Sequence, residues 1–345
     1  MFIRLVILLA AVSVFSCVSV SKIEIHVLEP ASDPLPPEIN RVILLNRTIA
    51  DTVLPPVQTV RPEPVISDKF RTDLLNKTTT ELMFALAGIL NESPGMDYID
   101  STMILEMVRP ERDHLPLPLD PLFVNELCDT LAADALISLE YLRVVYSDSI
   151  REERWNSMGG WDRYYWALIN VDITSGWRIY EGTGGRLIYE YANIDTLILD
   201  ITDWDINQLL YKMPHIDEVF METAYLTALD FARRISPHWM SGDRIIYFRG
   251  NRNMRKAYRH FISNELDIAE AIYLEQLDRL NRNMVAAAMH NLALVNEMRG
   301  DSRQALVWAR RSYQVVRKHL TSEYVEILEE RAEIAEQLDR QLGVE

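Results

Sequence analysis

The residues best suited to catalysis or metal binding are scattered through the sequence, and their spacing forms no recognisable site. The chain has seven histidines. No two of them stand in the His-Glu-x-x-His arrangement that places two imidazoles on one face of a helix, so the sequence predicts no zinc hydrolase. Carboxylate pairs such as Asp195 with Asp200 are common on protein surfaces, and a glycosidase is the weaker interpretation. We therefore expect no catalytic residue, no metal site and no cofactor.

Cys17 is the reactive side chain with the most informative surroundings. One cation, Arg4, precedes a nearly unbroken apolar run over residues 5–15, and a small residue, Ser16, stands directly before the cysteine. The run is shorter than the roughly 20 apolar residues that a membrane-spanning helix requires. This pattern predicts a secretory signal over residues 1–17 that is removed from the mature chain.

The segment Val14-Phe15-Ser16-Cys17 resembles the bacterial lipoprotein box, in which a branched apolar residue and a small residue precede the lipid-accepting cysteine. The resemblance implies that Cys17 carries lipid and anchors the chain to a membrane. Phe15 replaces the usual small residue, and an ordinary secretory peptide cut nearby is the alternative. Val18 resembles the residue of signals that permit transport to the outer membrane. We therefore expect a bacterial outer-membrane protein, or one of another cell membrane, that faces the periplasm.

The composition indicates a folded and acidic protein. The 345 residues are 48% hydrophobic and 9% aromatic, which is ample for a large core. A formal net charge of −16 disfavours binding to nucleic acid or to an anionic membrane surface. Residues 251–345 are nearly neutral, so a domain boundary is expected near residue 240. Cys128 lies in an apolar helical pattern and predicts a buried thiol, with no disulfide available.

Residues 23–240 alternate between strand-like and helical patterns, which predicts an α/β domain after a short tether at residues 18–22. We expect strands near residues 23–28, 42–45, 102–105, 135–146, 164–180 and 186–199, and helices near 68–91, 120–133 and 216–235. The glycines of residues 182–185 predict a tight antiparallel hairpin rather than a phosphate loop, because no Lys-Ser or Lys-Thr follows them. The predicted fold is a mixed sheet with flanking helices.

Residues 241–345 predict an all-α domain. Amphipathic segments near residues 252–263, 266–280, 284–299, 302–317 and 321–342 are separated by short turns, which is typical of antiparallel neighbouring helices.

Part of this region resembles a tetratricopeptide repeat, with Leu292-Ala293 in the first helix, Gly300 at the turn and Ala305 in the second helix. Small residues at these places let two helices approach closely. Ala271 lies 34 residues before Ala305 and Leu266 takes the place of the turn glycine, which indicates a second, degenerate repeat. A plain helical bundle is the alternative.

The whole layout also resembles a group of uncharacterised lipoproteins of Bacteroidota-type bacteria, which pair an α/β domain with a short helical repeat tail. The segments that carry this resemblance are Leu28-Glu29-Pro30-Ala31, residues 42–48, residues 177–180 and residues 291–308. No activity follows from it. A strand ending in Asn-Arg before a long helix further resembles the N-terminal α/β domain of TolB, which is an analogy of fold alone.

Three groups of residues are candidates for binding a partner. They are Trp155, Trp161 and Trp166 in an aromatic hairpin, Asn46 and Arg47 after a buried strand, and His290 and Trp308 on the repeat helices. Each has a structural alternative: the aromatic side chains fit the core of a twisted sheet, Arg47 could pair with an acidic residue, and His290 is more typical of packing.

We expect a non-enzymatic scaffold of the cell envelope that binds a protein partner, because short helical repeats form grooves that are commonly used for peptide capture. The alternative is a small-ligand or glycan-binding or processing protein that uses the α/β domain.

Overall fold

A computed structural model describes residues 20–48, 68–97, 99–100, 104–107, 115–157 and 160–344. The signal, Cys17 and most of the proline-rich segment after residue 48 lie outside this part of the chain. The described residues form two compact units. The sheet unit comprises residues 31–238 and 341–343, and the helical unit comprises residues 20–30, 239–340 and 344.

The sheet unit contains a five-stranded mixed sheet with the strand order β3-β2-β4-β5-β6. Its strands are β2 (Val42–Asn46), β3 (Leu105–Glu106), β4 (Ala135–Ser157), β5 (Gly160–Glu181) and β6 (Leu187–Asp203). β2 is parallel to β3 and β4, whereas β4, β5 and β6 are successively antiparallel. The predicted antiparallel hairpin at residues 182–185 is the β5–β6 connection. There a side chain at Gly185 would clash with the Pro121 carbonyl oxygen, 1.9 Å from an ideal Cβ.

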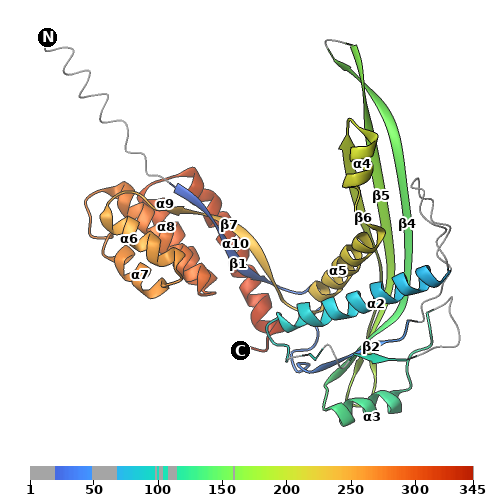
Figure 1. Ribbon diagram of the computed structural model, residues 1–345. Coiled ribbons are helices and arrows are strands. Elements are labelled where there is room, and N and C mark those ends of the chain that lie inside the picture. Colours follow the sequence, from blue (N-terminus) through green and yellow to red (C-terminus); the bar gives the residue numbers. More distant parts are fainter. Residues whose placement is uncertain are drawn as a thin grey trace. The chain divides into compact units, whose positions relative to one another are not determined.

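β4 and β5 are longer than the sequence predicted. Their pairing runs from Ala135 with Glu181 to Ser157 with Gly160, beyond the last β5–β6 pair, Tyr165 with Asp203. The end of the β4–β5 hairpin is therefore a two-stranded ribbon (Figure 1). Residues 151–156 are all exposed, so they lack the apolar alternation that marks a strand with one buried face.

Four described helices flank the sheet: α2 (Asp68–Asn91), α3 (Pro121–Leu131), α4 (Ile206–Lys212) and α5 (Ile216–Ile235). The largest core cluster joins α2 and α5 to one face of the sheet, with Leu86, Phe220 and Trp177 among its fully buried members. On the other face α3 places Val124 and Cys128 against Leu136 of β4. Burial raises the pKa of the Cys128 thiol to about 11, with Asp129 a smaller cause, as suits a structural cysteine.

α4 lies in a stretch to which the sequence analysis assigned neither a strand nor a helix. Asp205 is its N-cap, because the carboxylate accepts hydrogen bonds from the backbone N–H groups of Asn207 and Gln208. Asp205 therefore begins a helix.

The helical unit consists of five helices and a two-stranded sheet. The helices are α6 (Arg252–Ile262), α7 (Leu266–Leu274), α8 (Arg282–Met298), α9 (Ser302–Val315) and α10 (His319–Gln341), and the strands are β1 (Val20–Glu29) and β7 (His238–Tyr247). The C-terminal region is thus helical, in line with its pattern.

β1 differs from its expected place. The sequence assigned residues 23–28 to the α/β domain and residues 18–22 to a tether, but β1 begins at Val20 and pairs with β7 in the helical unit. β7 was not predicted, because Ser241 and Gly242 interrupt its apolar pattern. A partner strand more than 200 positions away in the chain determines this pairing, and local periodicity carries no information about it.

The turn between α6 and α7 also differs from the repeat alignment. Asn264, with φ of 59°, has the left-handed conformation that Gly300, with φ of 83°, adopts between α8 and α9. Ala269 is the fully buried alanine of α7, whereas Ala271 is exposed. Both features lie two residues before the places expected from Leu266 and Ala271, so the alignment was shifted by two.

Among the described residues, no helix is both long and apolar enough to cross a membrane.

Candidate functional site

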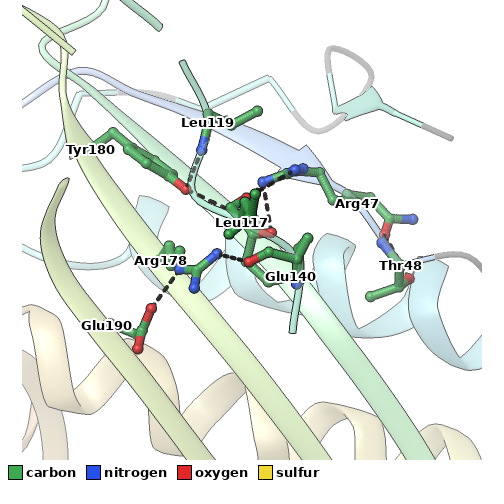
Figure 2. Close-up of polar contacts among 10 residues, drawn as sticks. Arg47, Thr48, Leu117, Leu119, Glu140, Arg178, Tyr180 and Glu190 are labelled. Atoms are coloured by element: carbon green, nitrogen blue, oxygen red, sulfur yellow. Dashed lines mark hydrogen bonds and ion pairs between the residues drawn. The ribbon is translucent and has the colours of Figure 1, made fainter. Parts of the chain in front are cut away.

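Arg47 lies in a buried polar network of the sheet unit rather than at an open strand end (Figure 2). Its Nη1 donates to both carboxylate oxygens of Glu140, at 2.9 Å and 2.7 Å. Glu140 lies at the bulge of β4, between Leu139 and Tyr141, and is fully buried. The Tyr180 hydroxyl adds a 3.4 Å contact to the same carboxylate. The arginine therefore neutralises a carboxylate inside the sheet unit.

The main chain of residues 115–119 closes over this ion pair. Arg47 Nη2 donates to the Leu117 carbonyl, Arg178 donates to the Pro116 carbonyl, and the Leu119 N–H donates to the Tyr180 hydroxyl (Figure 2). The contacts hold the segment against the sheet.

Asn46 has a local role at the end of β2. Its side-chain oxygen accepts hydrogen bonds from the backbone N–H and the hydroxyl of Thr48, at 3.0 Å and 2.7 Å. Such a bond turns the chain after a strand.

The aromatic residues singled out in the sequence do not form one cluster. Trp177 is fully buried and stacks on Phe231, with ring centroids 4.2 Å apart. Trp155 is 60% exposed on the two-stranded ribbon. Trp166 is half-buried, with Arg151 5.8 Å from its ring centroid and its indole N–H donated to Asp200. The side chain of Trp161 lies outside the described part.

A separate pair of rings lies beside β5. Tyr164 meets Trp204 edge-on, with centroids 5.8 Å apart, and the Trp204 side chain is 64% exposed. Trp204 was not among the candidate residues that the sequence suggested. Its exposure next to Tyr164 makes this pair an aromatic surface of the sheet unit that a ligand could reach.

A polar cluster joins β6 to α5. Asn193 donates to Asp195 at 3.0 Å and to Asp230 at 3.3 Å, and the Tyr191 hydroxyl donates to Asp230 at 3.2 Å. Burial and, to a smaller extent, the charge of Asp230 raise the pKa of Asp195 to about 6. The Asp195 carboxyl therefore takes up a proton as the pH falls through about 6.

The helical unit contains a groove of about 440 Å³ bordered by β7, α8 and α10. Its lining residues are Asp243, Arg244, Ile245, His290, Leu320, Glu323, Tyr324, Glu326, Ile327 and Glu330. The volume falls within the range of ligand sites in proteins. Four of these side chains are carboxylates and three are aliphatic, so the groove combines negative charge with apolar surface.

His290 is where the sequence placed a candidate, but its ring is used to hold β7. It is 1% exposed, with Nε2 2.8 Å from the Ile245 carbonyl oxygen and Nδ1 3.3 Å from the Thr321 hydroxyl. The neighbouring Asn291 pairs with both backbone groups of Tyr247. Burial lowers the pKa of His290 to about 4, so the ring is neutral at pH 7 and donates from Nε2 to the carbonyl.

The base of the groove contains an ion pair that the sequence did not predict. Arg244 of β7 donates from Nη2 to Glu297 of α8 at 2.6 Å, and the Tyr324 hydroxyl donates to the same carboxylate at 2.7 Å. Burial raises the pKa of Tyr324, with Glu297 contributing, so the phenol stays protonated. A glutamate inside the apolar run of α8 was the available signal, because a buried carboxylate requires a partner.

Trp308 lies on α9, half-buried against the core of the helical unit, with Arg311 5.2 Å from its ring centroid. It packs and does not line the groove. Within the described ranges, no group of three or more histidine, cysteine or carboxylate side chains is arranged to hold a metal ion.

Comparisons with known proteins give families without an assigned role. No curated protein matches the chain. One solved structure that resembles it is described as a "neuraminyllactose-binding hemagglutinin homolog from Helicobacter pylori". The identity is 10%, the match covers 60% of this chain and 89% of that chain, and the TM-score is 0.22. So low a TM-score supports no argument.

Two family models match the sequence. One, described as "Domain of unknown function (DUF6340)", matches residues 255–330 within the helical unit. The other, "Domain of unknown function (DUF8603)", matches residues 39–247, which is more than half of the chain. The chain therefore belongs to the DUF8603 family.

Proposed function

We propose that this protein is a non-enzymatic scaffold of the bacterial cell envelope that binds a protein partner through the groove of its helical unit. The observation that carries the proposal is the groove itself. Its base is built from Arg244, His290 and Tyr324. Arg244 and Tyr324 both donate to the Glu297 carboxylate, and His290 donates to the main-chain carbonyl of Ile245. Polar groups that are already paired position a surface but are not free to react, which favours binding over catalysis.

The proposal includes a lipid anchor at Cys17 and a periplasm-facing place at the outer membrane. Its support is the N-terminal sequence, which resembles the signals of bacterial lipoproteins, including those of Bacteroidota-type bacteria. Membrane fractionation of Cys17→Ala tests the anchor. The variant should move to the soluble fraction, and unchanged sedimentation with membranes would count against lipidation.

The proposal further treats the helices as tetratricopeptide-like. Two helix pairs, α6–α7 and α8–α9, each turn at a residue with positive φ, and α10 follows them as a capping helix. Ala305 and Ala309 are fully buried against α8, as close helix packing requires. For the sheet unit we propose a resemblance in fold to the N-terminal domain of TolB, and this resemblance implies no shared function.

Site-specific photo-crosslinking in intact cells tests the binding function. A photoreactive amino acid at position 327, in the groove, should give a discrete crosslinked protein, whereas the same group at Glu333 should not. Glu333 lies on the same helix, is exposed and does not line the groove. Equal crosslinking from both positions, or none from 327, would reject the groove as the binding surface.

A second candidate function is binding of a small ligand or glycan by the sheet unit. It is favoured by the exposed Trp204 ring beside Tyr164, since saccharides stack on aromatic faces. Binding of cell-wall fragments that is abolished by Trp204→Ala, with position 327 silent in crosslinking, would favour this candidate over the scaffold.

A further inference from the structure

The groove of the helical unit carries negative charge that the protein does not neutralise. Glu326 and Glu330 line it and have no ion-pair partner among the described residues. On other sides of the same helix, Glu329 pairs with Arg310 at 2.7 Å and Glu336 pairs with Arg303 at 3.5 Å. The unpaired carboxylates of α10 therefore include those that face the groove.

The remaining charges of the groove do not change this balance. Asp243 pairs with Lys22 at 2.7 Å, and Glu323 lies 3.3 Å from His319, a contact that is ionic only when the histidine is protonated. Arg244 is the cation among the lining residues, and its guanidinium is held by the buried Glu297. A ligand therefore meets an uncompensated negative rim.

Apolar side chains lie between these carboxylates. Leu320, Tyr324 and Ile327 recur on α10 at intervals of three and four residues, so they share a face with Glu323 and Glu330, and Ile245 of β7 faces the same space. A surface with this alternation buries aliphatic side chains while its rim attracts cations. Neither a purely polar cation nor a neutral apolar segment satisfies both requirements.

We propose that the groove binds a segment of the partner protein in which lysine or arginine alternates with aliphatic residues. This inference rests on the proposed protein-binding function and specifies the chemistry of the partner. Charge complementarity supports it, because opposite potentials across an interface determine which partners associate and how fast.

Fluorescence anisotropy on the full chain, held in detergent, tests the inference. The probes are three short labelled peptides that alternate leucine with lysine, with serine or with glutamate. The Leu-Lys peptide should bind most tightly and weaken with added salt, because the attraction is screened. Equal binding of the Leu-Ser or Leu-Glu peptide would overturn the inference.

Charge reversal tests whether the peptide binds to the groove or responds only to the net charge of the chain. Glu326→Lys with Glu330→Lys should weaken the Leu-Lys peptide by at least about tenfold. The matched control, Glu333→Lys with Asp339→Lys, makes the same change in net charge on the same helix, outside the groove, and should have little effect. Equal weakening by both pairs would show that the peptide senses net charge and would refute the groove.

Crosslinking and peptide binding together distinguish a failure of the cationic-partner inference from a failure of the proposed scaffold function. A discrete crosslink at position 327 with no preference for the Leu-Lys peptide would refute the cationic partner and leave the scaffold standing. Absence of both signals would refute both. Thermal unfolding of each variant verifies that the helical unit remains folded.

Discussion

In the sheet unit Arg47 and Glu140 form a buried ion pair beneath residues 115–119, whereas in the helical unit Arg244 and Glu297 form one at the base of a groove. The two pairs are buried to nearly the same extent: the side chains are 9% and 0% exposed in the first pair and 8% and 1% in the second. Burial therefore does not distinguish them. The difference is the cover, which is main chain in one case and unpaired carboxylates in the other.

A buried charge pair is therefore not by itself the mark of a binding site. Each pair satisfies groups that would otherwise be buried alone. What makes the second region a candidate is an accessible volume next to the pair, with chemistry that nothing in the described chain complements.

Removing one partner of either pair gives the largest expected effect. Glu140→Ala and Glu297→Ala should each lower the free energy of unfolding by about 3–5 kcal/mol, because an arginine is left buried without its counter-ion. Urea unfolding measures the change. Replacing both partners, with Arg47→Met and Glu140→Leu, should restore most of the loss. This double variant should bind the Leu-Lys peptide normally, and a loss of binding would contradict the separation of the two regions.

Protonation of His290 should weaken the helical unit in acid. The pKa of an ordinary histidine, 6.5, falls to about 4 here, so between these values the unfolded chain takes up a proton and the folded protein does not. The stabilisation is complete above the higher value and decreases as pH falls toward the lower, by up to about 3 kcal/mol. His290→Gln should flatten this part of the stability profile measured in urea. A profile identical to that of the unsubstituted protein would contradict the assignment.

Asp195 should produce the opposite pH dependence in the sheet unit. Its pKa rises from 3.8 to about 6, so the folded protein holds the proton more tightly, and stability is lost as pH rises through the higher value. Asp195→Asn should therefore raise the free energy of unfolding at neutral pH by about 1–2 kcal/mol, reduced from the full shift because the site is partly solvated. The gain should vanish below about pH 4. A gain that is the same at every pH would point to packing instead.

Trp155→Ala should have the smallest effect. The ring is 60% exposed on the two-stranded ribbon, and its removal should change the free energy of unfolding by less than about 0.5 kcal/mol. The same variant should leave peptide binding by the groove unchanged. A destabilisation comparable to that of a core aromatic residue would show that the ribbon is packed more firmly than its exposure indicates.

Much of the secondary structure was predictable because it follows local patterns. The helix at 216–235 coincides with α5, the helix at 68–91 coincides with α2, and the five C-terminal helices begin within a few residues of their expected positions. Apolar spacing and capping residues determine such elements within one or two turns of chain. The ends of β4 and β5 were not predicted, because solvent surrounds that ribbon and its residues do not alternate between apolar and polar.

The candidate site could be predicted only in part. The sequence named His290 and placed it in a helix, yet its role as an anchor of β7 depends on a carbonyl 45 positions away. The groove forms only where β7 lies next to α10, and in the sequence its residues Glu326, Ile327 and Glu330 look like those of any amphipathic helix. Nothing in their spacing distinguishes them from Glu329 and Glu336, which are paired.

The sequence by itself determined the acidic balance, the change from mixed strand and helix patterns to a wholly helical one, and most helices, because each depends on composition or on neighbours within a few residues. Only the tertiary structure decided that β1 pairs with β7, that Arg47 meets Glu140 and that Arg244 meets Glu297. These contacts join residues between 53 and more than 200 positions apart. Their partners are selected by the packing of whole elements, which no local pattern encodes.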